Sequence, residues 1–550
     1  MQYDLIALNC RYSHSCLSLF YLNRALRKWI PGCRIRINQF TINEPYYHIL
    51  LHLTALDSEA IFFSVYLWNS GIIGKLIKDL YLVKPNLPII LGGPQALHLD
   101  GETLPPNCST VRGPVEGLSL TFYQDLQAKK TADHYEAGKE TYFPFPYTDQ
   151  DFSEGLVNRN IYYESSRGCP FSCSYCLSAE GEGVHTKDIT EVKKELAEIM
   201  GHRPGVVRFV DRTFNFSAPR SLEIWHYLKS RGEKTVFHFE IAPDLFTEDM
   251  FLFLETVRPG RFQFEIGLQS TNPETLKAIN RVTDTEKSLE TIKRLAANNN
   301  IHLHVDLILG LPSDNCDTFR RSFNQVFQSC PHYIQMGLLK VLPQTPIRDQ
   351  AEELGLTYRQ EPPYQILSTR WLSHQELGRL YWFGQCVEAF YNNRYFVSFF
   401  SYLRKREEGF DFFQNLLDLC RAENFFRLAG TQEFMTTLLC KLTEQREDRR
   451  IIREILRYDW LRTGKRFLPE PLASVDLQAA KKRMRGTLPH DYPPFYTRKT
   501  RNIFFKQSTF SPFSTKAMQE LGIPPGREKT VCFLPEQEDT VKRLQRTAAF

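Results

Sequence analysis

The stretch NIYYESSRGCPFSCSYCLSAEGEG, residues 160–183, decides the interpretation of the fold. It places Cys169, Cys173 and Cys176 in a Cys-x3-Cys-x2-Cys pattern directly after a strand-like run. Three thiolates on one short loop suit one side of an iron–sulfur cubane, because such clusters are held by cysteine sulfur. A [4Fe–4S] cluster bound in this way keeps one iron open, since the next cysteine, Cys316, lies far along the chain.

A structural zinc site is the alternative for the same three cysteines. It needs a fourth ligand and commonly uses Cys-x2-Cys pairs. His185 is available, but Cys-x3-Cys-x2-Cys-x8-His is not a usual zinc spacing. The other ten of the thirteen cysteines are scattered, and we expect them to pack as small apolar residues.

Strand-like runs alternate with helix-like runs from residue 159 to 355. Such alternation is typical of parallel sheets covered by helices. Six strand–helix units predict a partial (β/α)6 barrel, whose reactive groups lie at the carboxyl ends of its strands. The strand candidates are NIYYESS (160–166), VVRFVD (206–211), VFHFEIA (236–242), RFQFEIGLQ (261–269), HLHVDLILGL (302–311) and YIQMGLLKV (333–341).

Residues 1–127 show the same alternation, which predicts a doubly wound α/β domain of the flavodoxin or Rossmann type. Its strand candidates are DLIALN (4–9), CRIRINQF (33–40), AIFFSVYLW (60–68), PIILGGP (88–94) and STVRG (109–113). Residues 128–158 lose this periodicity and gain polar residues and proline, as a linker does. Residues 356–550 predict a mainly helical C-terminal region.

The composition narrows the class of protein. Lys plus Arg numbers 68 against 63 for Asp plus Glu, so net charge gives no case for a nucleic-acid partner. No apolar run is long enough to span a membrane, and the N-terminal MQYDLIALNCRYSH lacks the features of a secretory signal. We therefore expect a cytoplasmic protein without a membrane partner, whose cysteines stay reduced.

The cysteine loop resembles that of the radical S-adenosylmethionine superfamily, which has an aromatic residue just before the last cysteine, here Tyr175. The resemblance implies that the amino and carboxylate groups of S-adenosylmethionine chelate the open iron, with Tyr175 near the adenine. It also implies that an electron from the cluster cleaves the sulfonium to give a 5′-deoxyadenosyl radical. An external donor such as flavodoxin or ferredoxin would supply that electron.

The same resemblance implies which strand ends contact S-adenosylmethionine. Glu240 ends the third barrel strand, and Gln269 and Ser270 end the fourth. Asp211 and Arg212, in FVDRTFN (209–215), stand where the family usually has a Gly-Gly-Glu stretch, and this departure leaves their contact with the methionine amine open. Each of these polar side chains has the alternative role of capping a strand–helix junction. No catalytic residue is assigned beyond the cluster ligands.

A doubly wound domain ahead of such a barrel resembles the cobalamin-binding class of the superfamily. The residues that support this lie at or just after strand ends, where glycine lets the backbone approach a ligand closely. They are Ser64 in SVYLWNS and Gly92, Gly93 and Pro94 in LGGPQA. The resemblance therefore implies a cobalamin site at this edge of the sheet.

The cobalamin motif of the family, Asp-x-His-x-x-Gly, is not intact in this sequence. His14 matches the histidine, but Tyr12 and Leu17 stand in place of the aspartate and the glycine. A bond between cobalt and His14 is therefore in doubt. A capping or buried histidine is the alternative for His14, and a scaffold without cofactor is the alternative for the domain.

Residues from about 360 to 470 resemble an uncharacterised helical extension that follows the same two domains in bacterial proteins. This resemblance supplies no chemistry. The aromatic residues of the extension are expected to form a helix core and its basic residues a solvated face.

Together these features predict a radical enzyme that transfers a methyl group from cobalamin to a small-molecule or peptide substrate. Rearranging and cyclising enzymes share the same features, so the reaction type and the substrate stay open. One alternative is a radical enzyme without cobalamin, such as a methylthiotransferase acting on RNA. The other is a zinc-stabilised scaffold without catalytic activity.

Overall fold

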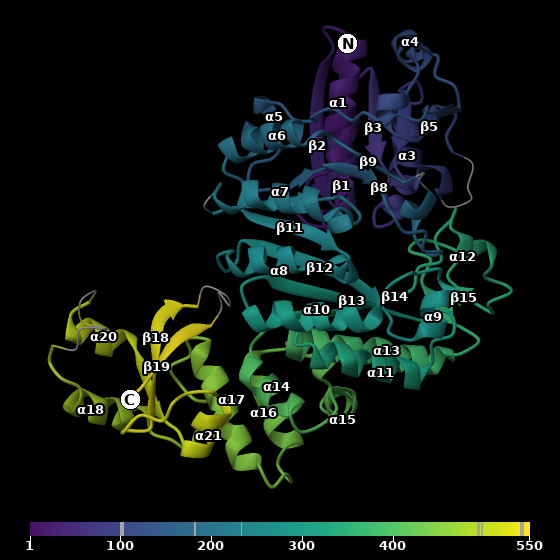
Figure 1. The fold of residues 1–550 in the computed structure, drawn as a ribbon. Coiled ribbons are helices and arrows are strands. Elements are labelled where there is room, and N and C mark those ends of the chain that lie inside the picture. Colours follow the sequence, from purple (N-terminus) through teal and green to yellow (C-terminus); the bar gives the residue numbers. More distant parts are fainter. Residues whose placement is uncertain (100–103, 181–182, 233, 492–495, 497–498, 539–543) are drawn as a thin grey trace.

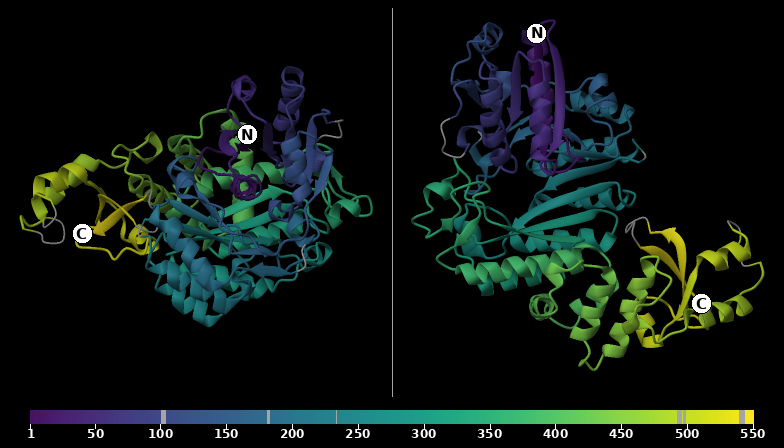
Figure 2. Two further views of the ribbon diagram at one scale, coloured as in Figure 1. Left: turned by 90° about the horizontal axis from the view of Figure 1, so that it is seen from above. Right: turned by 180° about the vertical axis from the view of Figure 1, so that it is seen from behind.

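The computed structural model describes residues 1–99, 104–180, 183–232, 234–491, 496, 499–538 and 544–550 (Figure 1). The chain forms three parts in sequence order: an N-terminal α/β domain, a barrel-like domain and a C-terminal region (Figure 1). The barrel-like domain lies between the other two, and the two ends of the chain are far apart (Figure 2).

The N-terminal domain is built on a parallel sheet in the order β2-β1-β3-β4-β5-β6. Its elements are β1 (Gln2–Asn9), α1 (Leu17–Trp29), β2 (Arg34–Thr41), α2 (Tyr46–Ala55), β3 (Ala60–Ser64), α3 (Ser70–Val83), β4 (Ile89–Gly92), β5 (Cys108–Arg112), α4 (Leu120–Ala128) and β6 (His134–Glu136). All five predicted strands are present. In addition, β6 pairs with β5, so the sheet continues into the segment predicted as a linker.

Helices cover both faces of this sheet, because successive side chains of a strand point to opposite faces. Tyr3, Leu5 and Ala7 of β1 are buried against α1 and α4. Ile6 and Leu8 of the same strand are buried against α2 and α3. This arrangement confirms the doubly wound α/β prediction.

The second domain is a parallel sheet of six strands in the order β14-β13-β12-β11-β10-β7. Its elements are β7 (Ile161–Tyr163), α6 (Ile189–Gly201), β10 (Val206–Phe209), α7 (Ala218–Lys229), β11 (Val236–Ile241), α8 (Glu248–Glu255), β12 (Phe262–Gln269), α9 (Pro273–Ala278), α10 (Thr285–Asn298), β13 (His302–Leu309), α11 (Cys316–Gln328) and β14 (Tyr333–Leu338). Each strand falls where the sequence predicted it, and the partial barrel is confirmed.

Aromatic side chains form the contact between this sheet and its helices. Phe209, Phe239 and Phe264 are fully buried, and the ring of Phe264 lies 5.6 Å from that of Trp225 on α7. The residues between them in the strands face the opposite, concave side of the sheet. Aromatic packing thus uses only the helix-covered side of the sheet, and the side chains on the concave side do not take part in it.

The C-terminal region differs in part from the helical prediction. Its elements are α12 (Pro346–Asp349), β15 (Thr357–Tyr358), β16 (Ile366–Ser368), α13 (His374–Val387), α14 (Val397–Arg404), α15 (Gly409–Ala422), α16 (Gln432–Leu442), α17 (Arg449–Arg462), α18 (Leu477–Thr487), α20 (Arg501–Gln507), β17 (Thr509–Pro512), α21 (Thr515–Glu520), β18 (Thr530–Gln537) and β19 (Gln545–Ala549). Most are helices, but β17, β18 and β19 form an antiparallel sheet near the end of the chain.

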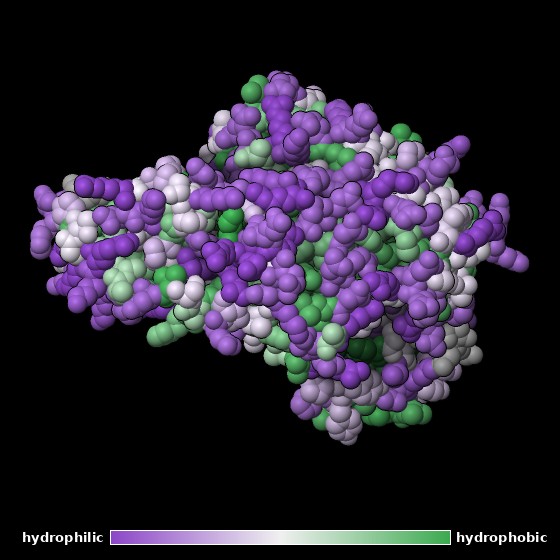
Figure 3. All heavy atoms as spheres, turned by 90° about the horizontal axis from the view of Figure 1, so that it is seen from below, coloured by the Kyte–Doolittle hydropathy of each residue, from purple (hydrophilic) through white to green (hydrophobic). Residues whose placement is uncertain are grey.

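The first C-terminal helices share a core with the barrel domain. Phe323 of α11 lies 4.8 Å from Phe383 of α13, and Phe383 lies 4.7 Å from Phe410 of α15, as measured between ring centroids. The face shown in Figure 3 is mostly hydrophilic, with hydrophobic side chains interspersed. None of the helices in the described part of the chain is long and apolar enough to cross a membrane.

Candidate functional site

The cysteine loop follows β7 and is framed by a small antiparallel hairpin of β8 (Ser166–Gly168) and β9 (Val184–Thr186). Backbone hydrogen bonds fix its middle: the N–H of Ser174 donates to the carbonyl of Ile279, and the N–H of Ile347 donates to the carbonyl of Ser174, each at 2.9 Å. The end of α9 and the start of α12 thus hold the loop from two sides. Cys173 is buried, and Cys169 and Cys176 are partly exposed.

Arg281 gives this loop a fixed positive charge. Its Nη1 lies 3.6 Å from the sulfur of Cys173, and its Nη2 donates to the carbonyl of Gly267. Burial raises the pKa of the Cys173 thiol, and the guanidinium of Arg281 opposes that shift. A cation beside the sulfur favours the thiolate, which is the form that binds metal.

The three cysteines open into one cleft of about 230 Å³ at the carboxyl ends of the barrel strands. Among the described residues, no three His, Cys, Asp or Glu side chains converge tightly enough to hold a single metal ion. A cubane needs a wider spacing, because each thiolate binds a different corner. The three sulfurs therefore line one cleft, with the guanidinium of Arg281 beside that of Cys173.

Three of the predicted S-adenosylmethionine contacts line this cleft: Tyr175, Glu240 and Gln269. Gln269 has a left-handed backbone with φ of 71°, which ends β12 at the cleft wall. Burial raises the pKa of Glu240 to about 7, despite the opposing charge of Arg212. Near neutral pH this carboxyl can therefore both donate and accept hydrogen bonds.

The structure differs from the prediction at Asp211. Its carboxylate accepts hydrogen bonds from the backbone N–H of Ser165 and from the hydroxyls of Ser165 and Ser166, so it faces the start of the cysteine loop. The following residues, Arg212 and Thr213, line the cleft instead. Asp211 supports the loop and does not reach the cleft.

Ser270 is likewise turned away from the cleft. It is buried, its hydroxyl lies 3.4 Å from that of Ser322 on α11, and it accepts a hydrogen bond from the N–H of Asn272. These bonds make it part of the junction between β12 and α9. The capping alternative, and not ligand contact, describes Ser270.

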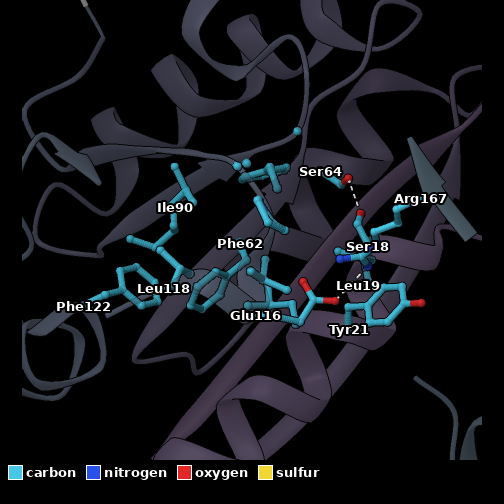
Figure 4. Close-up of a pocket in the computed structure, with 18 residues that line it drawn as sticks. Ser18, Leu19, Tyr21, Phe62, Ser64, Ile90, Glu116, Leu118, Phe122 and Arg167 are labelled. Carbon is cyan, nitrogen blue, oxygen red and sulfur yellow. Dashed lines mark hydrogen bonds and ion pairs between the residues drawn. The ribbon is translucent and has the colours of Figure 1, made fainter. Parts of the chain in front are cut away.

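The N-terminal domain has its own pocket of about 170 Å³ at the carboxyl edge of its sheet (Figure 4). Its wall is mainly apolar, with Phe62, Ile90, Leu118 and Phe122 (Figure 4). We call this the apolar pocket.

The predicted cofactor residues of this domain border the apolar pocket or the space next to it. Ser64, Gly92 and Gly93 line the pocket, and Ser64 Oγ lies 2.9 Å from Ser18 Oγ (Figure 4). Gly93 has φ of 106°, and a Cβ there would lie 2.6 Å from the carbonyl oxygen of Val65. Only glycine fits this position, and the close neighbour is the Val65 backbone, whereas the sequence predicted close approach to a ligand. Pro94 lines the neighbouring central cavity.

A central cavity of about 860 Å³ lies between the N-terminal domain and the barrel. His14 lines it and is engaged by the barrel, since its Nδ1 lies 2.5 Å from the hydroxyl of Tyr162. Burial, together with the charges of Arg208 and Arg11, lowers the pKa of His14. The histidine is thus neutral and paired, in agreement with its alternative as a partly buried residue.

Several residues of the site were missed by sequence reasoning. Arg281 follows α9 with no motif around it, and Arg167 lies inside the quoted loop without a predicted role. Arg208, His238 and Glu265 lie on predicted strands and line the central cavity. The sequence does contain a pattern that could have found them: each of the three alternates with buried aromatic or aliphatic residues in its strand, so it faces the other side of the sheet.

Residues 163–326 match the radical SAM superfamily, and residues 352–520 match a family described as a protein of unknown function, DUF4080. The chain is similar to 2-(S-pantetheinyl)-carbapenam-3-carboxylate methyltransferase of Streptantibioticus cattleyicolor, 22% identical over 64% of this chain and 60% of the relative. It is also similar to the cobalamin-dependent radical SAM methyltransferase TokK of Streptomyces tokunonensis, 25% identical over 55% of this chain and 50% of TokK. The chain spans about half to three-fifths of the length of these relatives.

Two solved structures share the fold. OxsB, a cobalamin-dependent S-adenosylmethionine radical enzyme with aqua-cobalamin and S-adenosylmethionine bound, superposes with a TM-score of 0.57 at 14% identity, over 84% of this chain and 78% of OxsB. The radical S-adenosylmethionine methyltransferase TsrM of Kitasatospora setae superposes with a TM-score of 0.51 at 15% identity, over 67% of this chain and 80% of TsrM. At these identities the likeness is one of fold.

Proposed function

Because residues 163–326 belong to the radical SAM superfamily, we propose that this chain is a cobalamin-dependent radical enzyme that methylates a carbon of its substrate. The two curated relatives are methyltransferases, and TokK is described as cobalamin-dependent. The order of domains and the DUF4080 match over residues 352–520 agree with the family resemblance of the sequence.

One observation carries the proposal: the three spaces described above share their walls. The central cavity shares Tyr21 and Arg167 with the apolar pocket, and it shares Arg212, Glu240 and Glu265 with the cysteine cleft. A substrate in the central cavity would therefore lie between a cofactor on the N-terminal domain and one on the cysteine loop.

When bound, a [4Fe–4S] cluster and S-adenosylmethionine supply a 5′-deoxyadenosyl radical, and cobalamin supplies the methyl group. Cys169, Cys173 and Cys176 would hold the cluster, while Arg281 balances the negative charge of the thiolates. Tyr175 and Gln269 would orient S-adenosylmethionine from the cleft wall.

The side chains of the N-terminal domain would bind and shield cobalamin. Phe62, Ile90 and Leu118 offer an apolar wall that excludes water, and burial of apolar surface needs no directional contact. Ser64 and the backbone at Gly93 would meet the polar edge of the cofactor, with Pro94 beyond them at the central cavity.

The proposed reaction takes up electrons from outside the chain. We include in the proposal an external donor, such as flavodoxin or ferredoxin, and a cytoplasmic location, where thiols remain reduced. The substrate is a small molecule or a peptide.

Anaerobic reconstitution tests the proposal directly. We expect about four irons per chain and retention of hydroxocobalamin at about one equivalent. Methyl-labelled S-adenosylmethionine should then transfer its label to a product in wild type but not in Cys173→Ala. A cluster without cobalamin would favour a cobalamin-independent radical enzyme, and zinc without iron would favour the scaffold.

A further inference from the structure

The concave face of the barrel sheet is polar across four neighbouring strands. Arg208 on β10, His238 and Glu240 on β11, and Glu265 on β12 line the central cavity, and Asp306 on β13 lines the adjoining cleft. In complete barrels such positions are filled mainly by branched apolar side chains that pack against one another. Here the polar side chains surround an open space.

His238 is the most informative residue of this face. Its side chain is 8% exposed, and its Nε2 lies 3.0 Å from Glu265 Oε2 and 3.2 Å from Arg208 Nη2. Within the described part of the chain, its Nδ1 is buried and has no hydrogen-bond partner. Buried polar atoms are nearly always paired, so an unpaired Nδ1 on a residue that lines the central cavity points to a partner that the described part of the chain does not supply.

The state of the His238 ring defines what that ligand must offer. Burial lowers the pKa of His238 although the hydrogen bond to Glu265 opposes the shift, so the ring is neutral. The shorter of the two Nε2 contacts is the one to Glu265, at 3.0 Å against 3.2 Å to Arg208, so we assign the ring proton to Nε2, which leaves Nδ1 as an acceptor. A ligand group that meets Nδ1 must therefore carry an N–H or O–H donor.

We propose that this concave face binds a small hydrophilic substrate, whose hydroxyl or amine donates to Nδ1 of His238 and whose carbonyl or carboxylate oxygen accepts from Arg208. The inference rests on the proposed function and names the substrate class of the same site. A hydrocarbon substrate does not fit: Arg208, His238 and Glu265 pair with one another, but a hydrocarbon would displace water from this polar face and give it no hydrogen bond in return.

The first experiment compares two substrate pools with the reconstituted, cobalamin-loaded enzyme. The probes are the water-soluble and the chloroform-soluble metabolites of one bacterial extract, each supplied with methyl-labelled S-adenosylmethionine. We expect label in the water-soluble pool. Label confined to the chloroform-soluble pool would overturn the inference and leave the proposed function standing. Label in neither pool, with the cluster assembled, would overturn both.

The second experiment distinguishes two roles of His238: binding of the substrate through Nδ1 and positioning of the Glu265 side chain through Nε2. The amide of His238→Asn falls near the position of Nδ1, whereas that of His238→Gln falls near Nε2 and keeps the bond to Glu265. With the unreacted water-soluble fraction as substrate and methyl-labelled S-adenosylmethionine as the methyl source, we expect His238→Gln to raise the apparent KM at least about tenfold, the usual scale for a lost buried hydrogen bond. His238→Asn should stay within a few-fold of wild type.

The matched control is His226→Asn, which changes an exposed histidine on α7 outside the barrel. Iron content per chain and the thermal midpoint identify any variant that fails to fold. If His238→Gln behaves as wild type while His238→Asn is impaired, His238 only positions Glu265 and the inference is wrong.

Discussion

Two concave regions at the carboxyl ends of parallel sheets have opposite linings in this molecule. The apolar pocket of the N-terminal domain is walled by Phe62, Ile90 and Leu118, whereas the concave barrel face presents Arg208 and Glu265. An apolar wall holds a large ligand by burial and tolerates variation in its position. A polar wall selects by direction, because each unpaired donor or acceptor is penalised. Under the proposed function, the carboxyl edge of the sheet would retain cobalamin in the N-terminal domain and select the substrate in the barrel.

Among the tests of this contrast between the N-terminal pocket and the barrel, we expect the largest effect from Cys173→Ala. Loss of one of the three ligands should reduce iron from about four per chain to near background after anaerobic reconstitution. Retention of hydroxocobalamin should be unchanged, because the apolar pocket contains none of the cysteines. Cys316→Ala, at the start of α11, is the control and should keep the iron. Joint loss of iron and cobalamin would show that the two regions are not independent.

The polar lining should also produce a dependence of stability on pH. Burial raises the pKa of Glu240 from 4.5 to about 7. The charges of Arg212 and Arg208 oppose this shift, and those of Glu265 and Asp211 add to it. Between these values the folded chain holds a proton that the unfolded chain releases, so stability falls as pH rises through this range. Glu240→Gln removes the effect and should gain about 3 kcal/mol relative to wild type between about pH 5 and about pH 8.

Denaturant unfolding followed by circular dichroism at the two pH values measures this difference. If the unfolding free energies of wild type and Glu240→Gln change by the same amount between the two pH values, the Glu240 carboxyl titrates normally and is well solvated, which would contradict the prediction.

The apolar pocket depends instead on close backbone packing. Gly93→Ala places a Cβ 2.6 Å from the carbonyl oxygen of Val65 at a φ of 106°, so we expect a loss of ~1–3 kcal/mol in stability and weaker cobalamin retention. Gly92→Ala is the matched control, since a Cβ there meets nothing within 4 Å. Thermal unfolding and gel filtration with hydroxocobalamin measure both. Equal losses in the two variants would contradict the role of this close approach.

The smallest effect is expected for His14→Ala. Its Nδ1 is 2.5 Å from the hydroxyl of Tyr162, so the variant loses one partly buried hydrogen bond, about 1 kcal/mol. Cobalamin should still bind, and the electron paramagnetic resonance spectrum of its cobalt(II) form should lack nitrogen hyperfine splitting from histidine in wild type and variant alike. Such splitting in wild type would show that His14 leaves Tyr162 to ligate cobalt.

The sequence predicted the parallel sheets well, because hydrophobic alternation and strand length survive as local patterns. It also located the cysteine loop, since all three ligands lie within one short segment. It could not predict the direction of side chains at strand ends. Asp211 and Ser270 lie at the strand ends where the sequence placed them, but their side chains contact Ser165 and Ser322 and not the cysteine cleft.

The C-terminal sheet was missed for a related reason. β17 and β18 are joined through α21, and residues 539–543 between β18 and β19 lie outside the described residues. The proline-rich sequence there breaks regular alternation, so pairing is decided by tertiary contacts. His238 could not be predicted for a different reason: its alternation with Phe237 and Phe239 indicates a strand, but the sequence does not show that a polar side chain on that strand lines a cavity.

Arg167 links the two domains at a single guanidinium. It forms ion pairs with Glu116 of the N-terminal domain at 2.8 Å and with Glu164 of the barrel at 2.9 Å, and it lies 5.0 Å from the ring of Tyr21. It also lies two residues before Cys169 in the sequence. An opening between the domains that breaks the ion pair of Arg167 with Glu116 would therefore also disturb the start of the cysteine loop, so that entry of a large ligand by this route and assembly of the loop would be linked.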